Sequence, residues 1–173
     1  MRVTSVLLTT IAAVLLQASL ARYTAGGGWV FDLVVVGVVF SALWWGPGAG
    51  ILSGTLGGLM QDMLAGDIVG VGGLAKTVVG FLSGLVGTHF VLVRASARAL
   101  IVAAATLVHR LAVMGLHGLI DQQWPGVPWG ALAGEVAMNS LAAVLAFHAS
   151  SALPGIVARQ REQRRPSLSR RQW

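Results

Sequence analysis

The sequence has no cysteine, one tyrosine, five prolines and few charged residues, which make up 10% of its 173 positions. Without cysteine, disulfides, thiolate catalysis and cysteine-ligated metals are excluded. A soluble domain carries about 25% charged residues, so the scarcity of charge excludes an ordinary soluble fold. What is abundant is apolar, with 55% hydrophobic residues, 23 glycines and a mean hydropathy of +0.77. The composition therefore predicts an all-α integral membrane protein, and the length suits one domain.

Six apolar runs divide the chain, and each is long enough to form a transmembrane helix. They cover residues 3–21, 29–45, 46–65, 71–93, 100–120 and 129–153, and Pro154-Gly155 ends the last one. The first run could instead be a cleaved signal peptide, because Ser19-Leu-Ala21 is similar to a small-residue cleavage site. We expect it to be retained. Residues 1–157 then form a six-helix transmembrane domain, and residues 158–173 form a basic, disordered cytoplasmic tail.

Arginines lie mainly on one side of the expected membrane. The side with the termini holds nine, namely Arg2, Arg94, Arg98 and six in the tail, whereas the other side holds only Arg22. By the positive-inside rule, both termini should be cytoplasmic. The tail either contacts anionic lipid or docks a cytoplasmic partner. Nucleic acid is not an expected partner, because no fold or aromatic interleaving supports its binding.

Small residues recur at a four-residue step around the third and fourth runs. The first series is Gly46, Gly50, Gly54 and Gly58, ending at Asp62, and the second is Gly72, Lys76, Gly80 and Gly84. This step places residues on one helix face. Each helix glycine costs roughly 1 kcal/mol relative to alanine in water, whereas in lipid small faces let helices approach closely. We predict a glycine-packed helical hairpin that leaves a groove for a partner helix.

Polar residues inside the apolar runs form a second candidate site. They are Asp32, Gln61, Asp62, Lys76, Arg110, Glu135 and Asn139. Such residues are costly at bilayer depth unless they are paired, so we expect them to cluster toward the outer side. We predict that Lys76 pairs with Asp62 or Glu135, and that Arg110 pairs with Glu135. The cluster either holds the helices together by polar contacts or forms a polar pocket that opens outward. His109 is expected to pack between helices.

No catalytic or metal site is expected. The four histidines are scattered, and no carboxylate stands at ligand spacing from any of them. Ser53 and Ser83 lie among glycines, but two residues separate each serine from the preceding glycine. The rhomboid intramembrane proteases have one residue there, and serine among glycines is expected on a packed helix face. We therefore expect a protein that is not an enzyme and needs no cofactor.

Several of these motifs together resemble the rod shape-determining protein MreD family. The residues that carry the resemblance are Gln17, Asp32 with the following Leu33-Val-Val-Val36, the first glycine series, Gly58-Leu-Met-Gln-Asp62, Gly66, Gly70 and the segment 74–84. The family pattern is an aspartate before a hydrophobic run, Gly-x3-Gly, Gly-Leu-Leu-x-Asp and, after the turn, Gly-hydrophobic-Gly. Phe31 stands where the family usually has proline, and Lys76 is not part of that pattern.

The resemblance implies a non-enzymatic scaffold of the elongasome, the bacterial inner-membrane machine that inserts peptidoglycan along the side wall of rod-shaped cells. It implies MreC, through its transmembrane helix, as the partner, with RodA, a class B penicillin-binding transpeptidase and MreB beyond it. A second copy of the chain and membrane lipid are further expected partners. The family is similar in fold to the S component of energy-coupling-factor transporters, so the alternative is a vitamin-binding subunit. Such a subunit needs an outer pocket of roughly 300 Å³ or more.

Overall fold

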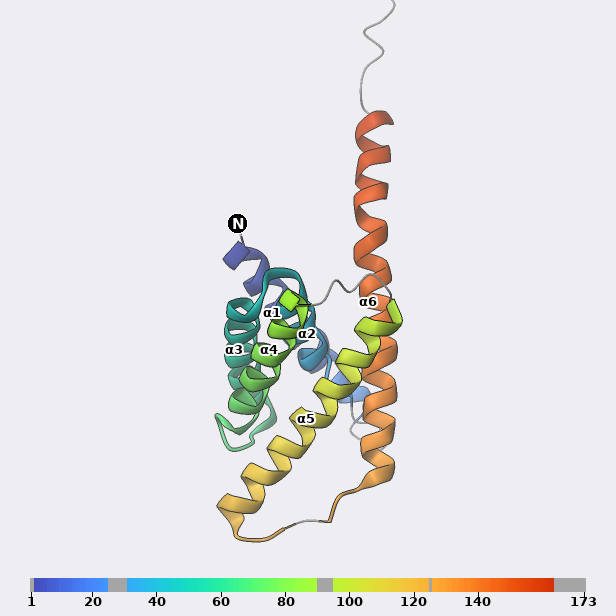
Figure 1. Cartoon of the computed structure of the whole chain (residues 1–173). Helices are drawn as coiled ribbons and strands as arrows, with labels where there is room; N and C mark the ends of the chain where they lie inside the picture. Colours follow the sequence, from blue (N-terminus) through green and yellow to red (C-terminus); the bar gives the residue numbers. More distant parts are fainter. Residues whose placement is uncertain (1, 25–30, 90–94, 125, 164–173) are drawn as a thin grey trace, which may run out of the picture.

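The computed structural model describes residues 2–24, 31–89, 95–124 and 126–163, and all regular structure in these ranges is α-helical. The helices are α1 (Arg2–Thr24), α2 (Leu33–Trp45), α3 (Pro47–Ala65), α4 (Val71–His89), α5 (Ala95–Asp121) and α6 (Trp129–Gln163). Successive helices run in alternating directions, so the start of α1 and the end of α6 lie toward the same end of the molecule (Figure 1). The predicted all-α class with six helices is confirmed.

Among the described residues, four helices are long and apolar enough to cross a membrane: α1, α4, α5 and α6. Helix α2 is apolar but has only 13 residues, about 20 Å at 1.5 Å per residue, against about 30 Å of bilayer hydrocarbon. It begins later than expected because Asp32 caps its first turn. Helix α3 has 19 residues, but its glycines lower its hydropathy. These helices indicate a membrane protein, with four helices long and apolar enough to span a bilayer and a shorter, buried helix packed among them.

Helix α2 is the centre of the fold, since it packs against each of the other five helices. Its valines at positions 34, 35, 38 and 39 are at most 1% exposed. One apolar cluster joins it to α4, α5 and α6 and consists of Val35, Val36, Val39, Val79, Val102, Ala105, Ala143 and Phe147. A smaller cluster joins it to α1 through Val14. A valine-rich run that would favour a strand in water is thus helical because helices surround it on every side.

Glycine brings the backbones of α3 and α4 into contact. At five positions of this interface an added Cβ would overlap backbone atoms of the facing segment. The pairs are Gly50 with Gly80, Gly54 with Lys76, Gly58 with Gly73, and Gly84 with Pro47. The hydroxyls of Thr55 and Thr77 bond across the same interface at 2.8 Å. The glycine faces therefore serve helix packing, and because α4 occupies the glycine face of α3, that face leaves no groove for a partner helix.

Gly46 differs from the other glycines of its series. It lies in the turn between α2 and α3 with a φ of +91°, a conformation that residues with a Cβ rarely adopt. Pro47 follows as the first residue of α3, where its missing N–H has no helical partner to lose. Gly46 therefore redirects the chain by a sharp turn, and the packed ridge of α3 begins at Gly50.

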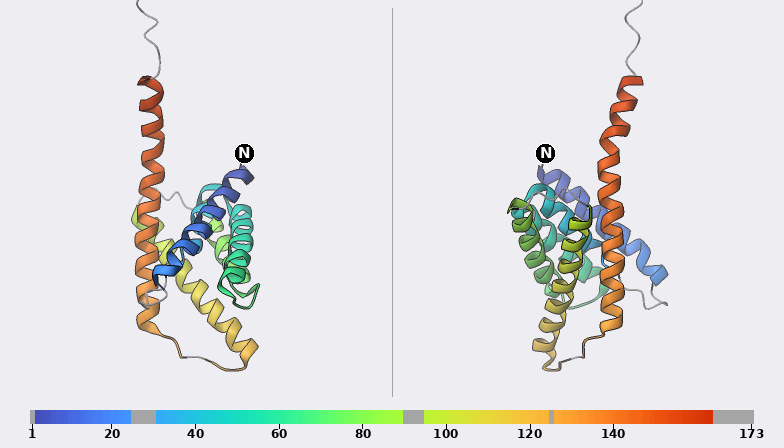
Figure 2. Two further views of the ribbon diagram at one scale, coloured as in Figure 1. Left: turned by 180° about the vertical axis from the view of Figure 1, so that it is seen from behind. Right: turned by 45° about the vertical axis from the view of Figure 1, so that its right-hand side comes forward.

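Helix α6 is longer than the sequence predicts. The expected end at Pro154-Gly155 is wrong, because the helix continues to Gln163 and its last turns stand clear of the other helices in both views (Figure 2). A proline removes its own backbone hydrogen bond, and here the helix continues beyond it. The apolar run marks where a bilayer would end, whereas the backbone remains helical past that point. The predicted disorder of the tail falls mostly on residues 164–173, which lie outside the described residues.

Replacing glycine by alanine should have opposite effects on stability inside and outside the α3–α4 contact. Gly54→Ala should lower the free energy of unfolding by about 1–3 kcal/mol, because the new Cβ meets backbone that has no room to yield. Gly130→Ala should leave stability unchanged or raise it by up to roughly 1 kcal/mol, because nothing lies within 4 Å of a Cβ there. Unfolding of the purified proteins in detergent measures both, and equal effects would contradict the close α3–α4 contact.

Candidate functional site

The backbone at the start of α2 is held by side chains from two other helices. Gln17 of α1 donates from Nε2 to the carbonyl of Phe31 and accepts at Oε1 from the N–H of Leu33, both at 2.9 Å. Asn139 of α6 accepts from the N–H of Asp32 at 2.9 Å. Three successive residues are therefore anchored where α2 has no preceding turn to satisfy its N–H groups.

The carboxylate of Asp32 connects three more helices. Its Oδ1 accepts from two backbone N–H groups in the first turn of α2, as an N-cap does. Its Oδ2 lies 2.9 Å from Nζ of Lys76, 3.4 Å from Nε2 of His109 and 3.4 Å from Nε2 of Gln61. These side chains come from α4, α5 and α3. Phe31, Asp32 and Leu33 are thus bound by side chains from all five other helices. We call these three residues the hub.

The predicted partner of Lys76 is wrong. Its ammonium pairs with Asp32 and also lies 3.2 Å from Nε2 of His109, rather than pairing with Asp62 or Glu135. Lys76 is 2% exposed, so its charge requires a close counter-charge. Asp32 provides it because the α3–α4 contact points Lys76 toward the start of α2, whereas the carboxylate of Asp62 is bound to other groups.

Asp62 caps helix α4 from the neighbouring helix. Its Oδ2 accepts from the N–H of Gly70 at 2.9 Å and of Gly73 at 3.2 Å, and its backbone carbonyl accepts from the N–H of Asp67 at 3.2 Å. A carboxylate at a helix N-terminus satisfies free N–H groups and faces the positive end of the helix dipole. Asp62 therefore fixes the turn that joins α3 to α4.

The predicted pairing of Arg110 with Glu135 is confirmed, with Nε and Oε2 3.2 Å apart. Glu135 is 2% exposed, and the side chain of Arg110 is 32% exposed. Together with the pair of Asp32 and Lys76, two acids and two bases cancel in the interior. Neutralising charges in pairs is what lipid requires of ionisable groups at bilayer depth.

Sequence reasoning placed His109 as a packing residue and did not single out Thr106. Both belong to the buried polar network, because His109 touches Asp32 and Lys76 and the hydroxyl of Thr106 accepts from Nδ2 of Asn139 at 3.1 Å. The spacing of these residues along the sequence could have indicated this. Thr106, His109 and Arg110 stand three and four residues apart, which places them on one face of α5.

Ser53 and Ser83, the two serines that stand among glycines, are buried. Ser53 is 1% exposed and donates to the carbonyl of Gly50 in its own helix at 3.3 Å. Ser83 is 5% exposed and lies on α4, where it lines a groove between α4 and α5. Within the described ranges, no group of three or more histidines and carboxylates gathers as a potential metal site. These serines act as small polar residues on close helix faces.

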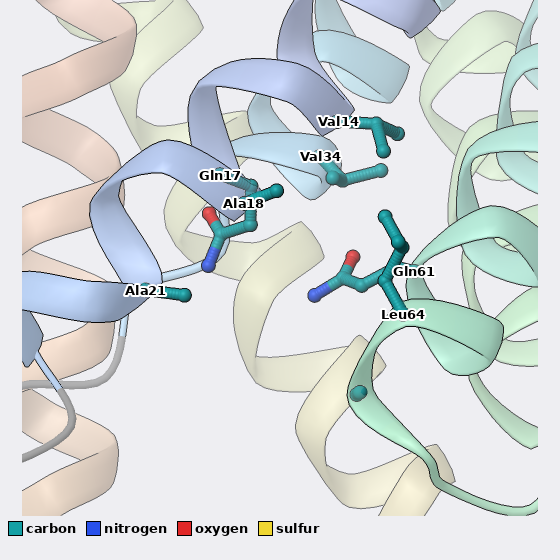
Figure 3. Close-up of a pocket in the computed structure, with 8 residues that line it drawn as sticks. Val14, Gln17, Ala18, Ala21, Val34, Gln61 and Leu64 are labelled. Carbon is teal, nitrogen blue, oxygen red and sulfur yellow. The ribbon is translucent and has the colours of Figure 1, made fainter.

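Two pockets meet at Gln61 and Ala65. The polar pocket has a volume of about 100 Å³ and is lined by Asp32, Gln61, Asp62, Ala65, Asp67, Ile68, Val71, Gly72, Lys76, His109, Arg110, Val113 and His117. The lateral pocket, about 230 Å³, lies between α1, α2 and α3 and is lined by Val14, Gln17, Ala18, Ala21, Val34, Gln61, Leu64 and Ala65 (Figure 3). Each is smaller than the roughly 300 Å³ of a typical small-molecule site, which argues against a vitamin-sized ligand.

The pair of Asp32 and Lys76 yields a prediction by double-mutant cycle. Asp32→Asn or Lys76→Met alone should cost about 3–5 kcal/mol of unfolding free energy, because each leaves the other charge buried and unpaired. The double variant should cost less than the sum of the two. Asp121→Asn, at an exposed acid of α5, is the control and should change stability by less than about 0.5 kcal/mol. Additive single effects in detergent would contradict the pairing.

A family model described as rod shape-determining protein MreD matches residues 1–125, which include α1 to α5 and the hub. No curated protein and no solved structure matches the chain. The expected similarity to the S component of energy-coupling-factor transporters therefore stays a prediction.

Proposed function

Because the chain belongs to the MreD family of rod shape-determining proteins, we propose that it is a non-enzymatic scaffold of the bacterial inner membrane. In this role it binds the transmembrane helix of MreC and supports lateral peptidoglycan synthesis by the elongasome. RodA, a class B penicillin-binding transpeptidase and MreB are the further proposed partners, and a second copy of the chain is another candidate. The observation that carries the proposal is the family match over 125 residues.

The arrangement of polar groups supports a scaffold. The buried charges form two ion pairs, Asp32 with Lys76 and Glu135 with Arg110, and the glycines contact backbone within the chain. A partner in the membrane would therefore meet the outer faces of the helices. We propose that all six helices cross the bilayer, with short α2 completing its crossing inside the bundle.

An apolar groove between α4 and α5 is the proposed docking face for the MreC helix. It has a volume of about 150 Å³ and is lined by Val79, Leu82, Ser83, Val86, Ile101, Ala104, Ala105 and Val108. Three of these residues are alanine or serine, which allow two helices to approach closely in lipid. Leu82 and Val108 remain 45% and 40% exposed at its sides, so apolar surface is available to an incoming helix.

Filling this groove tests the docking face. Ala104→Leu should reduce recovery of MreC with the tagged protein from membranes in mild detergent, because the larger side chain occupies the groove. Ala137→Leu places the same substitution at an exposed alanine of α6 and should leave recovery unchanged. Equal recovery with both variants would move the interface to another face. Absence of every cell-wall synthesis protein from the wild-type preparation would contradict the scaffold itself.

The proposed orientation places both termini in the cytoplasm, because most arginines lie on that side. The lack of cysteine makes single-cysteine labelling free of background. Gln123→Cys, in the exposed connection between α5 and α6, should react with a membrane-impermeant maleimide in spheroplasts. Ser96→Cys, exposed at the start of α5, should react only after permeabilisation. The reverse pattern would overturn the orientation.

A further inference from the structure

The polar pocket contains more hydrogen-bond acceptors than the protein satisfies. Gln61 donates from Nε2 to Asp32 at 3.4 Å, which fixes its amide so that Oε1 is an acceptor, and Oε1 is buried without a hydrogen-bond partner among the described residues. The bonds of Asp62 to the amides of α4 use Oδ2, which leaves Oδ1 to accept. Buried polar atoms without partners cost free energy, so Oε1 of Gln61 favours a ligand that donates, and the carboxylate of Asp62 can accept from the same ligand.

Two histidines contribute ring nitrogens to this pocket. His109 is 4% exposed, and its Nδ1 has no hydrogen-bond partner within the described ranges. In His117, Nδ1 lies 3.0 Å from the carbonyl of Val113, so Nδ1 carries the proton and Nε2 is the acceptor. An unpartnered buried ring nitrogen is rare in folded proteins and marks a position that a ligand can use.

The charges of the pocket are separated along its length. The Asp32 and Lys76 pair lies at its inner end, and the carboxylate of Asp67 lies in the exposed turn between α3 and α4. Arg110 lines the same pocket with its side chain 32% exposed. Its Nε faces Glu135, and a guanidinium has four further N–H donors. The pocket thus offers acceptors and a carboxylate for a small cation and donors for an anion beside it.

We propose that the polar pocket binds the ethanolamine headgroup of a zwitterionic phospholipid, with the ammonium between the carboxylates of Asp62 and Asp67 and the phosphate at Arg110. A volume of about 100 Å³ equals that of roughly three water molecules, which suits an aminoethyl group and leaves the phosphate at the mouth. Primary ammonium donates three hydrogen bonds, whereas the trimethylammonium of choline is bulkier and donates none. The pocket therefore selects ethanolamine over choline.

The surroundings of the pocket suit a lipid. The lateral pocket adjoins it at Gln61 and Ala65 and is lined mainly by alanine, valine and leucine, so an acyl chain can lie along it. Met63 and Leu64, just before the turn, are 68% and 65% exposed, as expected for side chains that face acyl chains. The site rests on the described side chains alone and does not depend on the proposed scaffold role.

Native mass spectrometry of the full chain in detergent tests the site, with dioleoyl phosphatidylethanolamine, phosphatidylcholine and phosphatidylglycerol as probes. The ethanolamine lipid should bind about tenfold more tightly than the other two, since each lacks either the N–H donors or the cation. Equal retention of the three lipids would overturn the proposal. Displacement of the lipid by free phosphoethanolamine at equal concentration would also overturn it and assign the pocket to a soluble ligand.

Asp67→Asn removes a pocket carboxylate at an exposed turn, so the variant should fold and should lose about fivefold to tenfold of the preference for ethanolamine over choline. Asp121→Asn removes an exposed acid that does not line the pocket and should keep the full preference. Asp62→Asn gives a second test, with thermal unfolding measured alongside, because Asp62 also caps α4. If the folded Asp67 variant retained the preference, the ammonium site would be refuted.

Discussion

The fold depends on how the first turn of a buried helix is satisfied. Helix α2 begins inside the bundle, where its free N–H groups have no water to bond. Asp32 provides the cap, and its remaining oxygen must then find a cation. Lys76 supplies that cation, and Gln17, Gln61, His109 and Asn139 complete the shell. One backbone requirement therefore draws a side chain from each of the other five helices to a single place.

The glycine contact between α3 and α4 works together with this hub. The two backbones touch, so α4 lies close enough to α3 for Asp62 to cap it. The same closeness directs Lys76 past α3 toward α2. Glycine packing sets the distance between helices, and the polar contacts set which residues face one another. Neither the glycine packing nor the polar contacts would be enough alone in lipid. Apolar side chains gain no free energy by moving out of lipid into the protein, because lipid is as apolar as they are.

A closed interior has consequences for function. The paired charges hold the bundle together, and a small polar pocket lies beside the turn between α3 and α4. The outer faces of α4 and α5 remain apolar and grooved. This division, with fixed interior contacts and exposed helix faces, is what the proposed scaffold needs, because partners in a membrane recognise helix surfaces.

The sequence by itself determined the class of the protein, its six helices, the glycine faces, the pair of Arg110 and Glu135 and the membership of most polar residues in one cluster. Hydropathy and spacing are local properties, so they can be counted along the chain. Only the tertiary structure decided that Lys76 meets Asp32, that Asp62 is a helix cap, and that His109, Thr106 and Gln17 belong to the network. Those choices depend on which of several carboxylates lies within a few ångströms of a given cation, and helix directions in space, rather than residue types, set that distance.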